Sequence, residues 1–227
     1  MLEEILKHER DWFFAINHLS TTFMDYMMWF FSYTKAWIPF FGVILFAIVY
    51  KKKTVDWISI VLAMVIVVGL CDLFSSGLCK PLFARFRPTH HPDFMNEVKT
   101  LFNYKGGKYG FISGHAANSF GIATFSALLF RRRLYVFIIM LWALIVAVSR
   151  VYLGAHFISD IVAGSISGIV IAALVYQLYK LYYSKILKRE SIPAFSPVLI
   201  NRTAIILAAY TVLVAVSSYW LVPMIKG

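Results

Sequence analysis

The chain has 227 residues, of which 60% are apolar, 17% are aromatic and only 15% are charged. Soluble domains average roughly half apolar and a quarter charged residues, so a soluble domain of this length would lack the polar side chains needed to cover its surface. The high apolar content excludes a disordered chain, and the presence of only two cysteines excludes a disulfide scaffold. The composition therefore predicts an integral membrane protein.

The net charge is +11, and an excess of Lys and Arg can indicate a nucleic-acid-binding protein. Here, however, many of the basic residues lie in short clusters between apolar runs, at 51–53, 131–133 and 180–189, and no nucleic-acid-reading motif accompanies them. Basic clusters of this kind fix the topology of membrane proteins. We therefore expect membrane lipids, and no nucleic acid, as partners.

In chain order, six segments are apolar enough to cross a bilayer, which takes about 20 residues of helix. They are residues 36–50 (extended upstream towards Met24), 57–79, 113–130, 134–149, 161–179 and 203–225. Cys71 and Cys79 lie eight residues apart on one such helix, about 12 Å, which is too far for a disulfide. No internal repeat is evident. We expect one domain over residues 1–227, an all-α integral membrane bundle of six transmembrane helices.

The first residues of the chain differ from these spans. Residues 1–10 mix Glu, Lys and Arg with Leu and Ile, and the aromatic residues Trp12, Phe13 and Phe14 follow. The mixed sign of the charges, and the lack of an apolar run with a small-residue cleavage site, argue against a cleavable signal peptide. Aromatic residues beside an amphipathic stretch are typical of a helix in the membrane interface. We expect an N-terminal amphipathic interfacial helix; the alternative is an extension of the first span.

The basic clusters also predict an orientation. If the clusters at 51–53, 131–133 and 180–189 face the cytoplasm, the loops at 80–111 and 151–159 face the opposite, outer side of the cytoplasmic (inner) membrane. An even number of spans places both termini on that outer side. The long loop is itself basic, so its charges need an explanation other than topology. These charged residues are Lys80, Arg85, Arg87, Lys99, Lys105 and Lys108.

Three polar segments at the ends of the predicted spans converge on that outer face. They are 80–88, 113–115 and 149–160. Lys80, Arg87 and Arg150 supply three cations, and the planar guanidinium groups suit phosphate oxygens. Ser113 and Gly114 open a helix, where free N–H groups and the helix dipole favour an anion. The segments therefore predict a phosphate-binding pocket.

Two imidazoles accompany this pocket. His156 and Asp160 are four residues apart and lie on one helical face, so the carboxylate can hold one ring nitrogen protonated and leave the other free as a nucleophile or base. His115 is available as a general acid. Each residue alone has an ordinary explanation, as a packing, snorkelling or capping group. Together, ionisable groups at membrane depth indicate function, and the chemistry is phosphoryl transfer.

The pattern Lys-x6-Arg-Pro, Ser-Gly-His and Ser-Arg-x5-His-x3-Asp resembles the signature of the type 2 phosphatidic acid phosphatase superfamily. All ten residues are present in order: Lys80, Arg87, Pro88, Ser113, Gly114, His115, Ser149, Arg150, His156 and Asp160. The motifs cover residues 80–160, and the six-span layout fits as well. One residue departs from the pattern: Ile112 stands where the family usually has Pro before Ser-Gly-His.

The resemblance implies a phosphatase that needs no metal and no cofactor. In the family the residue matching His156 attacks phosphorus and forms a phosphohistidine, and the residue matching Asp160 orients it. The residues matching Lys80, Arg87, Ser113, Gly114 and Arg150 hold the phosphate oxygens, and the one matching His115 protonates the leaving oxygen. Arg85 lies outside the signature and is a candidate contact for a second phosphate or a headgroup, or for bulk lipid headgroups.

The expected function is that of a cell-envelope lipid phosphatase, whose substrate is undecaprenyl diphosphate, phosphatidylglycerol phosphate, phosphatidic acid or the phosphate of lipid A. The sequence does not choose among these four lipids, nor does it indicate an oligomeric state. A phosphotransferase acting on lipid phosphates is an alternative. Vanadium haloperoxidases share the pocket but are soluble, and a non-enzymatic scaffold or transporter is disfavoured because no catalytic residue is missing.

Overall fold

The computed structural model describes residues 2–226, and within them the chain forms helices and no β-strand. The elements are α1 (Leu2–Asn17), α2 (Thr22–Ser32), η1 (Thr34–Trp37), α3 (Ile38–Val49), α4 (Thr54–Asp72), η2 (Leu73–Cys79), α5 (Lys80–Phe83), η3 (Pro88–His90), α6 (Gly114–Phe130), α7 (Arg133–Tyr152), α8 (Ile158–Lys185) and α9 (Pro197–Lys226). The predicted all-α class is confirmed.

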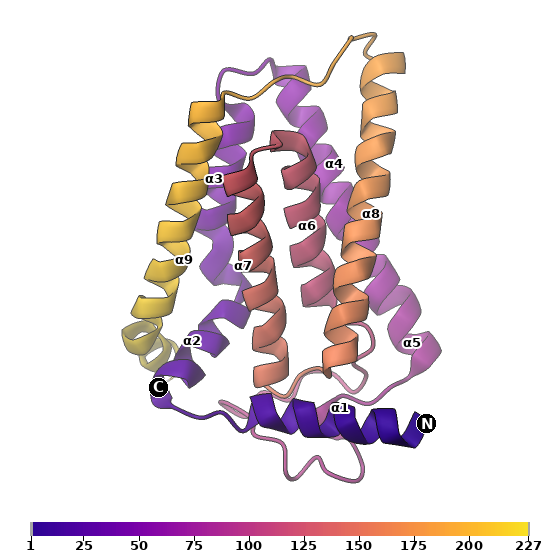
Figure 1. Ribbon diagram of the computed structural model, residues 1–227, viewed down its shortest axis with the longest axis vertical. Helices are drawn as coiled ribbons and strands as arrows, with labels where there is room; N and C mark the ends of the chain where they lie inside the picture. The colour runs from indigo at the N-terminus through magenta and orange to yellow at the C-terminus, as the bar shows by residue number, and fades with distance from the viewer. Residues whose placement is uncertain (1, 227) are drawn as a thin grey trace.

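The long helices α3, α4, α6, α7, α8 and α9 run side by side as a bundle, with α6 near its middle (Figure 1). By length and apolarity four helices qualify as membrane spans: Thr54–Phe83, which joins α4 to α5, and then α7, α8 and α9. The pair α2 and α3, bent by 73°, would be a fifth. Since α6 has only 17 residues and a polar first turn, the predicted number of six spans is approximate.

Helices α6 and α8 approach each other closely because glycines face the contact. A Cβ atom added at Gly168 would lie 2.2 Å from the carbonyl oxygen of Ala117, and one at Gly164 would lie 2.6 Å from the carbonyl oxygen of Ser113. Only a residue without a side chain fits such an approach. The contact fixes α8 against the start of α6.

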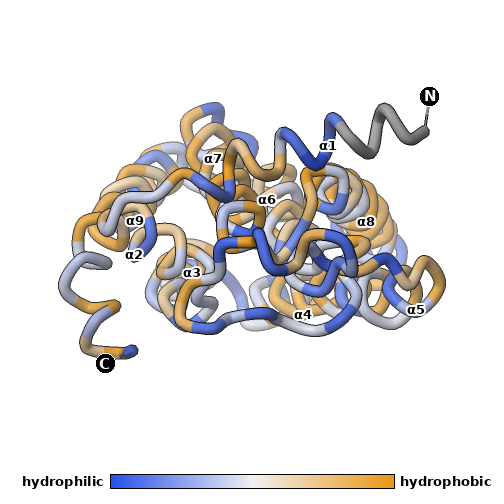
Figure 2. Tube along the Cα trace, turned by 90° about the horizontal axis from the view of Figure 1, so that it is seen from below, coloured by the Kyte–Doolittle hydropathy of each residue, from blue (hydrophilic) through white to orange (hydrophobic). Residues whose placement is uncertain are grey.

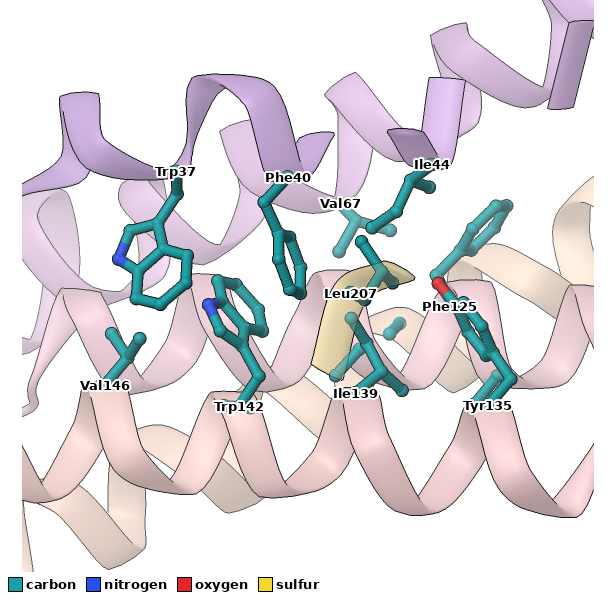
Figure 3. Packing of buried hydrophobic residues seen from close by; sticks show 14 of the residues in the cluster. Trp37, Phe40, Ile44, Val67, Phe125, Tyr135, Ile139, Trp142, Val146 and Leu207 are labelled. Atoms are coloured by element: carbon teal, nitrogen blue, oxygen red, sulfur yellow. The ribbon is translucent and has the colours of Figure 1, made fainter. Parts of the chain in front are cut away.

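An aromatic core joins η1 and α3, which follow the bend after α2, to α7. The rings of Phe40 and Trp142 stack with their centroids 4.8 Å apart, and Trp37 meets Trp142 edge-on at 5.6 Å. Figure 3 shows these side chains interleaved with Ile139, and Leu207 of α9 closes the same cluster. This packing explains why the chain bends after α2: the bend places Trp37 and Phe40 into the core.

The outer faces of the bundle are apolar, and its ends are polar. Large side chains such as Leu62, Leu174 and Ile205 are more than half exposed, which a soluble protein would avoid and a bilayer would cover. Hydrophilic segments gather over the end that carries α1 (Figure 2). The two cysteines, Cys71 and Cys79, are free and buried, as the sequence predicted.

Helix α1 is a separate helix that crosses one end of the bundle beneath α7 and α8 (Figure 1), and not an extension of the first span. Its Phe13 is fully buried and meets the ring of Phe157 edge-on at 5.5 Å, whereas Trp12 is 62% exposed. The helix therefore has one face packed on the protein and another free for the membrane interface, the location that the sequence predicts.

Candidate active site

The three polar segments meet at the end of the bundle that α1 crosses. The backbone N–H of Ser113 donates to the carbonyl of Asp160 at 3.0 Å, which joins the start of α6 to the start of α8. Arg87 reaches the connection between α7 and α8, where its Nη1 donates to the carbonyl of Ala155 at 3.1 Å. The predicted convergence of residues 80–88, 113–115 and 149–160 is thus observed.

Arg85 and Arg87 reach the site from a short extended segment. Phe86 forms an isolated antiparallel bridge with Tyr109. On either side of it, the N–H of Arg87 donates to the carbonyl of Lys108 at 3.0 Å, and the N–H of Gly110 donates to the carbonyl of Arg85 at 2.9 Å. In extended backbone, residues two apart point to the same side. The two arginines accordingly face the segment 155–160, and Phe86 between them does not.

Gly110 allows this bridge to approach the site. A Cβ atom added there would lie 3.1 Å from Cγ of Arg87 and 3.1 Å from Oδ2 of Asp160. Any larger residue would push either the arginine or the carboxylate away from its position. The glycine lies outside the three motifs, and no local pattern in the sequence indicates its role.

His156 is 2% exposed and lies between a carboxylate and a guanidinium. Its Nδ1 lies 3.3 Å from Oδ2 of Asp160, and its Nε2 lies 3.2 Å from Nη1 of Arg87. Because arginine only donates hydrogen bonds, Nε2 accepts and Nδ1 carries the proton that the carboxylate accepts. Burial, together with the positive charges of Arg87, Arg150 and Lys80, lowers the pKa of His156 well below its usual range. The ring is therefore neutral, with the Nε2 lone pair facing the arginine.

Asp160 is fully buried and its two oxygens have different partners. Oδ2 accepts from the backbone N–H of Phe157 at 3.0 Å in addition to the His156 ring, and Oδ1 accepts from Nη1 of Arg85 at 2.8 Å. A buried carboxylate is stable only when its oxygens are paired in this way. The cap of α8 and the arginine thus orient the carboxylate that orients His156.

The other two predicted cations have partners that a phosphate can displace. Nη2 of Arg150 donates to the hydroxyl of Tyr104 at 2.7 Å and its Nη1 to the hydroxyl of Ser32, while its buried Nε–H has no hydrogen-bond partner among the side chains that the structure describes, those of residues 8–226. Nζ of Lys80 donates to Oγ of Ser76 at 2.8 Å. Lys80 directly follows the π-helical segment η2, a feature often found at functional sites.

Ser113 is the N-cap of α6, and its hydroxyl accepts from the N–H of Ala116 at 3.4 Å. Gly114 lies so close to η2 that an added Cβ atom would be 3.1 Å from Oγ of Ser75. The buried Ile112 occupies the position of the usual proline. The first turn of α6 therefore carries the N–H groups expected of an anion site, directly against η2, the segment that Lys80 follows.

His115 separates two cavities that share Ser32 and Thr34 in their walls. The outer one, about 400 Å³, is also lined by Arg150, Tyr104 and two lysines. The inner one, about 260 Å³, has mostly apolar walls contributed by α2, η1, α3, α4, α6 and α7, including Trp37 and Trp142. The imidazole of His115 thus lines both the cavity that contains Arg150 and a cavity with room for an apolar group.

Arg85 lies beside the site but its guanidinium is occupied by protein groups. It bonds to Asp160, to Oγ of Ser159 at 2.6 Å and to Oε2 of Glu9 at 2.6 Å. The predicted contact of Arg85 with a headgroup therefore remains a prediction. Sequence reasoning did not identify Tyr104, Ser159 or Glu9; for Glu9 the only available signal was an acidic residue in an amphipathic stretch beside a basic loop.

Comparisons with known proteins agree with this geometry. The PAP2 superfamily matches the chain over residues 56–184. A lipid A 4′-phosphatase from Porphyromonas gingivalis is 41% identical over 178 residues, which cover 78% of this chain and 75% of that protein. A lipid A 4′-phosphatase from Bacteroides thetaiotaomicron is 36% identical over 157 residues, or 67% and 68% of the two chains.

Two solved structures share the fold. A transmembrane PAP2-type phosphatidylglycerolphosphate phosphatase from Bacillus subtilis superposes with a TM-score of 0.61 at 22% identity, over 77% of this chain and 86% of that one. LpxE from Aquifex aeolicus gives a TM-score of 0.55 at 24% identity, over 74% and 93%. Together with the sequence matches, they show that this chain belongs to the PAP2 superfamily and is a multi-pass membrane lipid phosphatase.

Proposed function

We propose that this lipid phosphatase removes the 4′-phosphate of lipid A through a phosphohistidine at His156, at the outer face of the cytoplasmic membrane. The choice of lipid is supported by the two relatives named lipid A 4′-phosphatase, at 41% and 36% identity. The proposal treats residues 1–227 as one domain, which the packing of α1 on α7 and α8 supports.

The observation that carries the mechanism is the pair of contacts made by His156. Nε2 lies at the phosphate-binding arginine, 3.2 Å from its Nη1, while Nδ1–H is held by Asp160. A phosphate that takes over the Nη1–H of Arg87 would therefore meet the lone pair of His156 that this hydrogen bond now occupies, which is the arrangement that nucleophilic catalysis needs.

The reaction has two displacement steps. Nε2 of His156 attacks phosphorus, and the bond from phosphorus to the sugar oxygen breaks. His115, whose protonated form is favoured once the phosphate dianion balances the surrounding cations, gives its proton to that oxygen. Water then attacks phosphorus and transfers a proton to His115, the phosphorus–nitrogen bond breaks, and inorganic phosphate leaves. The phosphate oxygens are held by Lys80, Arg87 and Arg150, by the hydroxyl of Ser113 and by the backbone N–H of Gly114. The positive charges and the dipole of α6 stabilise the transition state.

The charge of the transferring phosphoryl group is balanced by protein cations in this proposal, without a metal ion. Among residues 8–226, whose side chains the structure describes, no group of three His, Cys, Asp or Glu side chains is placed to hold a metal. Vanadate adopts the five-coordinate geometry of the transferring phosphoryl group and should therefore inhibit as a transition-state mimic.

The purified protein in detergent and EDTA tests the proposal against lipid A, phosphatidic acid, phosphatidylglycerol phosphate and undecaprenyl diphosphate. We expect the highest kcat/KM for phosphate release from lipid A, with activity retained in the chelator. A higher kcat/KM for another of the four lipids would show that the substrate assignment is wrong. Loss of activity in EDTA with recovery on adding Mg²⁺ would show that the mechanism is wrong.

A further inference from the structure

Glu9 of helix α1 contacts the active-site segment with both carboxylate oxygens. Oε1 accepts from the backbone N–H of Ser159 at 3.0 Å, and Oε2 accepts from Nη2 of Arg85 at 2.6 Å. Only 12% of the Glu9 side chain is exposed. An ion pair with this burial and geometry holds its partners in one arrangement, unlike an exposed pair.

The partner of Glu9 continues the chain of contacts into the site. Nη1 of Arg85 donates to Oδ1 of Asp160 at 2.8 Å, and its guanidinium lies 4.4 Å from the ring centre of Phe157. The aromatic ring on which it stacks is itself packed against Phe13 of α1. Both terminal nitrogens of the Arg85 guanidinium are thus held, Nη2 by Glu9 and Nη1 by Asp160.

This arrangement decides which oxygen of Asp160 faces the nucleophile. With Oδ1 held by Arg85, Oδ2 is left for the ring of His156 and the N–H of Phe157. Without Glu9, the side chain of Arg85, which is 25% exposed, could turn towards solvent or lipid phosphates. Asp160 would then keep a buried oxygen with no charged partner and would be free to rotate.

We infer that Glu9 is a positioning residue for the phosphatase, which acts through Arg85 on Asp160 and so orients the imidazole of His156. The N-terminal interfacial helix thereby belongs to the catalytic apparatus, in addition to any role at the membrane surface. The inference rests on the nucleophile role proposed above for His156.

A matched control is available in the same helix. Arg10 forms an ion pair with Glu97 of the long loop at 3.4 Å, which also ties α1 to the site end of the bundle. This pair is exposed, at 43% and 56% of the two side chains, and touches none of the catalytic residues. Glu97→Ala therefore reports how much the attachment of α1 to the bundle contributes by itself to kcat, KM and thermal stability.

The experiment measures kcat, KM and thermal stability for Glu9→Ala, for Glu9→Gln, which keeps the side-chain shape, and for Glu97→Ala. A misplaced catalytic group costs on the order of 10- to 100-fold in rate, so we expect Glu9→Ala to lower kcat by about that factor with KM within about twofold of the parent. Glu9→Gln should lose less, and Glu97→Ala should match the parent. In an Arg85→Ala background, adding Glu9→Ala should cause no further loss, because the contact through which Glu9 acts is gone.

Three results would overturn the inference: a kcat for Glu9→Ala equal to that of Glu97→Ala, an undiminished loss in the Arg85→Ala background, or a loss that appears in KM alone. If Glu9→Ala fails to fold, Glu9→Gln gives the same comparison. A His156→Ala variant measured alongside separates the two proposals. Activity in that variant would show that His156 is not the nucleophile, whereas the effect of Glu9→Ala on kcat is measured independently of it.

Discussion

The two ring nitrogens of His156 have neighbours of opposite kind, and this difference suits the residue to nucleophilic attack. The acceptor Asp160 faces Nδ1 and the donor Arg87 faces Nε2. In water a histidine exchanges its proton between the two nitrogens, whereas here the neighbours select one tautomer. In the proposed mechanism, the lone pair that attacks phosphorus is thus prepared before substrate binds.

This environment predicts the titration of His156. Because burial and three nearby cations lower the pKa, the ring stays neutral as pH falls through the usual value of about 6.5 and becomes protonated only in more acidic solution. In protein labelled with ¹³C-histidine, the signal that disappears in His156→Ala should titrate with a midpoint below 6.5. A midpoint at or above 6.5 would mean that the cations do not act on this ring.

The roles of the two histidines predict different dependences on the leaving group. Since no phosphoenzyme can form without a nucleophile, His156→Ala should abolish turnover of every substrate. A sugar or glycerol alkoxide needs a proton as it departs, so His115→Ala should lose on the order of 10²–10⁴-fold on a lipid phosphomonoester. Nitrophenolate departs readily without a proton, and the same variant should lose much less on p-nitrophenyl phosphate.

Both variants are therefore measured on phosphatidic acid and on p-nitrophenyl phosphate. Equal losses for His115→Ala on the two substrates would assign His115 to phosphate binding and not to proton donation. Turnover of the aryl ester by His156→Ala would remove His156 from the nucleophile role.

At the residue scale, the sequence predicted the members of the site but not what surrounds them. His156, Asp160 and Arg87 follow from motif spacing, because a fixed spacing on one helical turn or loop brings specific groups together. The contacts from Glu9 to Ser159 and Arg85 join residues 150 and 76 positions apart. No local sequence pattern records a contact between residues so far apart. The hydrogen bonds that occupy the guanidinium of Arg85 therefore follow only from the folded structure.

At the scale of elements, the glycines between α6 and α8 determine how the motifs meet. Ser113 and His115 begin one helix, and Asp160 begins the other, so any shift between the helices separates the groups of the site. The distance of 2.2 Å from an added Cβ at Gly168 to the carbonyl of Ala117 leaves no space for even a methyl group. The close approach is therefore part of the active-site geometry.

Gly168→Ala should consequently destabilise the protein and lower its activity together. Overpacking of this kind costs on the order of 1–3 kcal/mol, because α8 must move away from α6. Gly69→Ala is the matched control: it also lies in a helix, α4, and an added Cβ there has no atom within 4 Å. Thermal unfolding in detergent should show a lower Tm for Gly168→Ala and an equal or higher Tm for Gly69→Ala. Equal Tm values for the two would mean that the helices adjust without cost.

The elements themselves were predictable where apolar runs are long and uninterrupted. The spans at 57–79, 161–179 and 203–225 correspond to α4 with η2, to α8 and to α9. The 73° bend between α2 and α3 was not predicted, since hydropathy does not distinguish a straight apolar segment from a bent one. The bend depends on the tertiary contact of Trp37 and Phe40 with Trp142.

At the scale of the whole molecule, the three basic clusters and the candidate site lie at opposite ends of the bundle. The turns at 50–53 and 131–132 and the connection 186–196 lie at the end away from α1, and the residues of the candidate site lie at the α1 end (Figure 1). Basic clusters favour the cytoplasmic side. This separation supports the proposal that the site faces outward, where a lipid of the outer leaflet can reach it.

Cysteine labelling in intact cells tests this orientation. Lys105 lies in the loop over the site and Arg133 at the opposite end, and both side chains are exposed. The native Cys71 and Cys79 are buried, so the parent protein should react little and serves as the blank. A membrane-impermeant maleimide should label Lys105→Cys in intact cells and should label Arg133→Cys only after the membrane is permeabilised, because in the proposed topology only the first residue is outside. Labelling of Arg133→Cys alone in intact cells would reverse the topology and place phosphate release in the cytoplasm, and the substrate would then have to be a lipid of the inner leaflet.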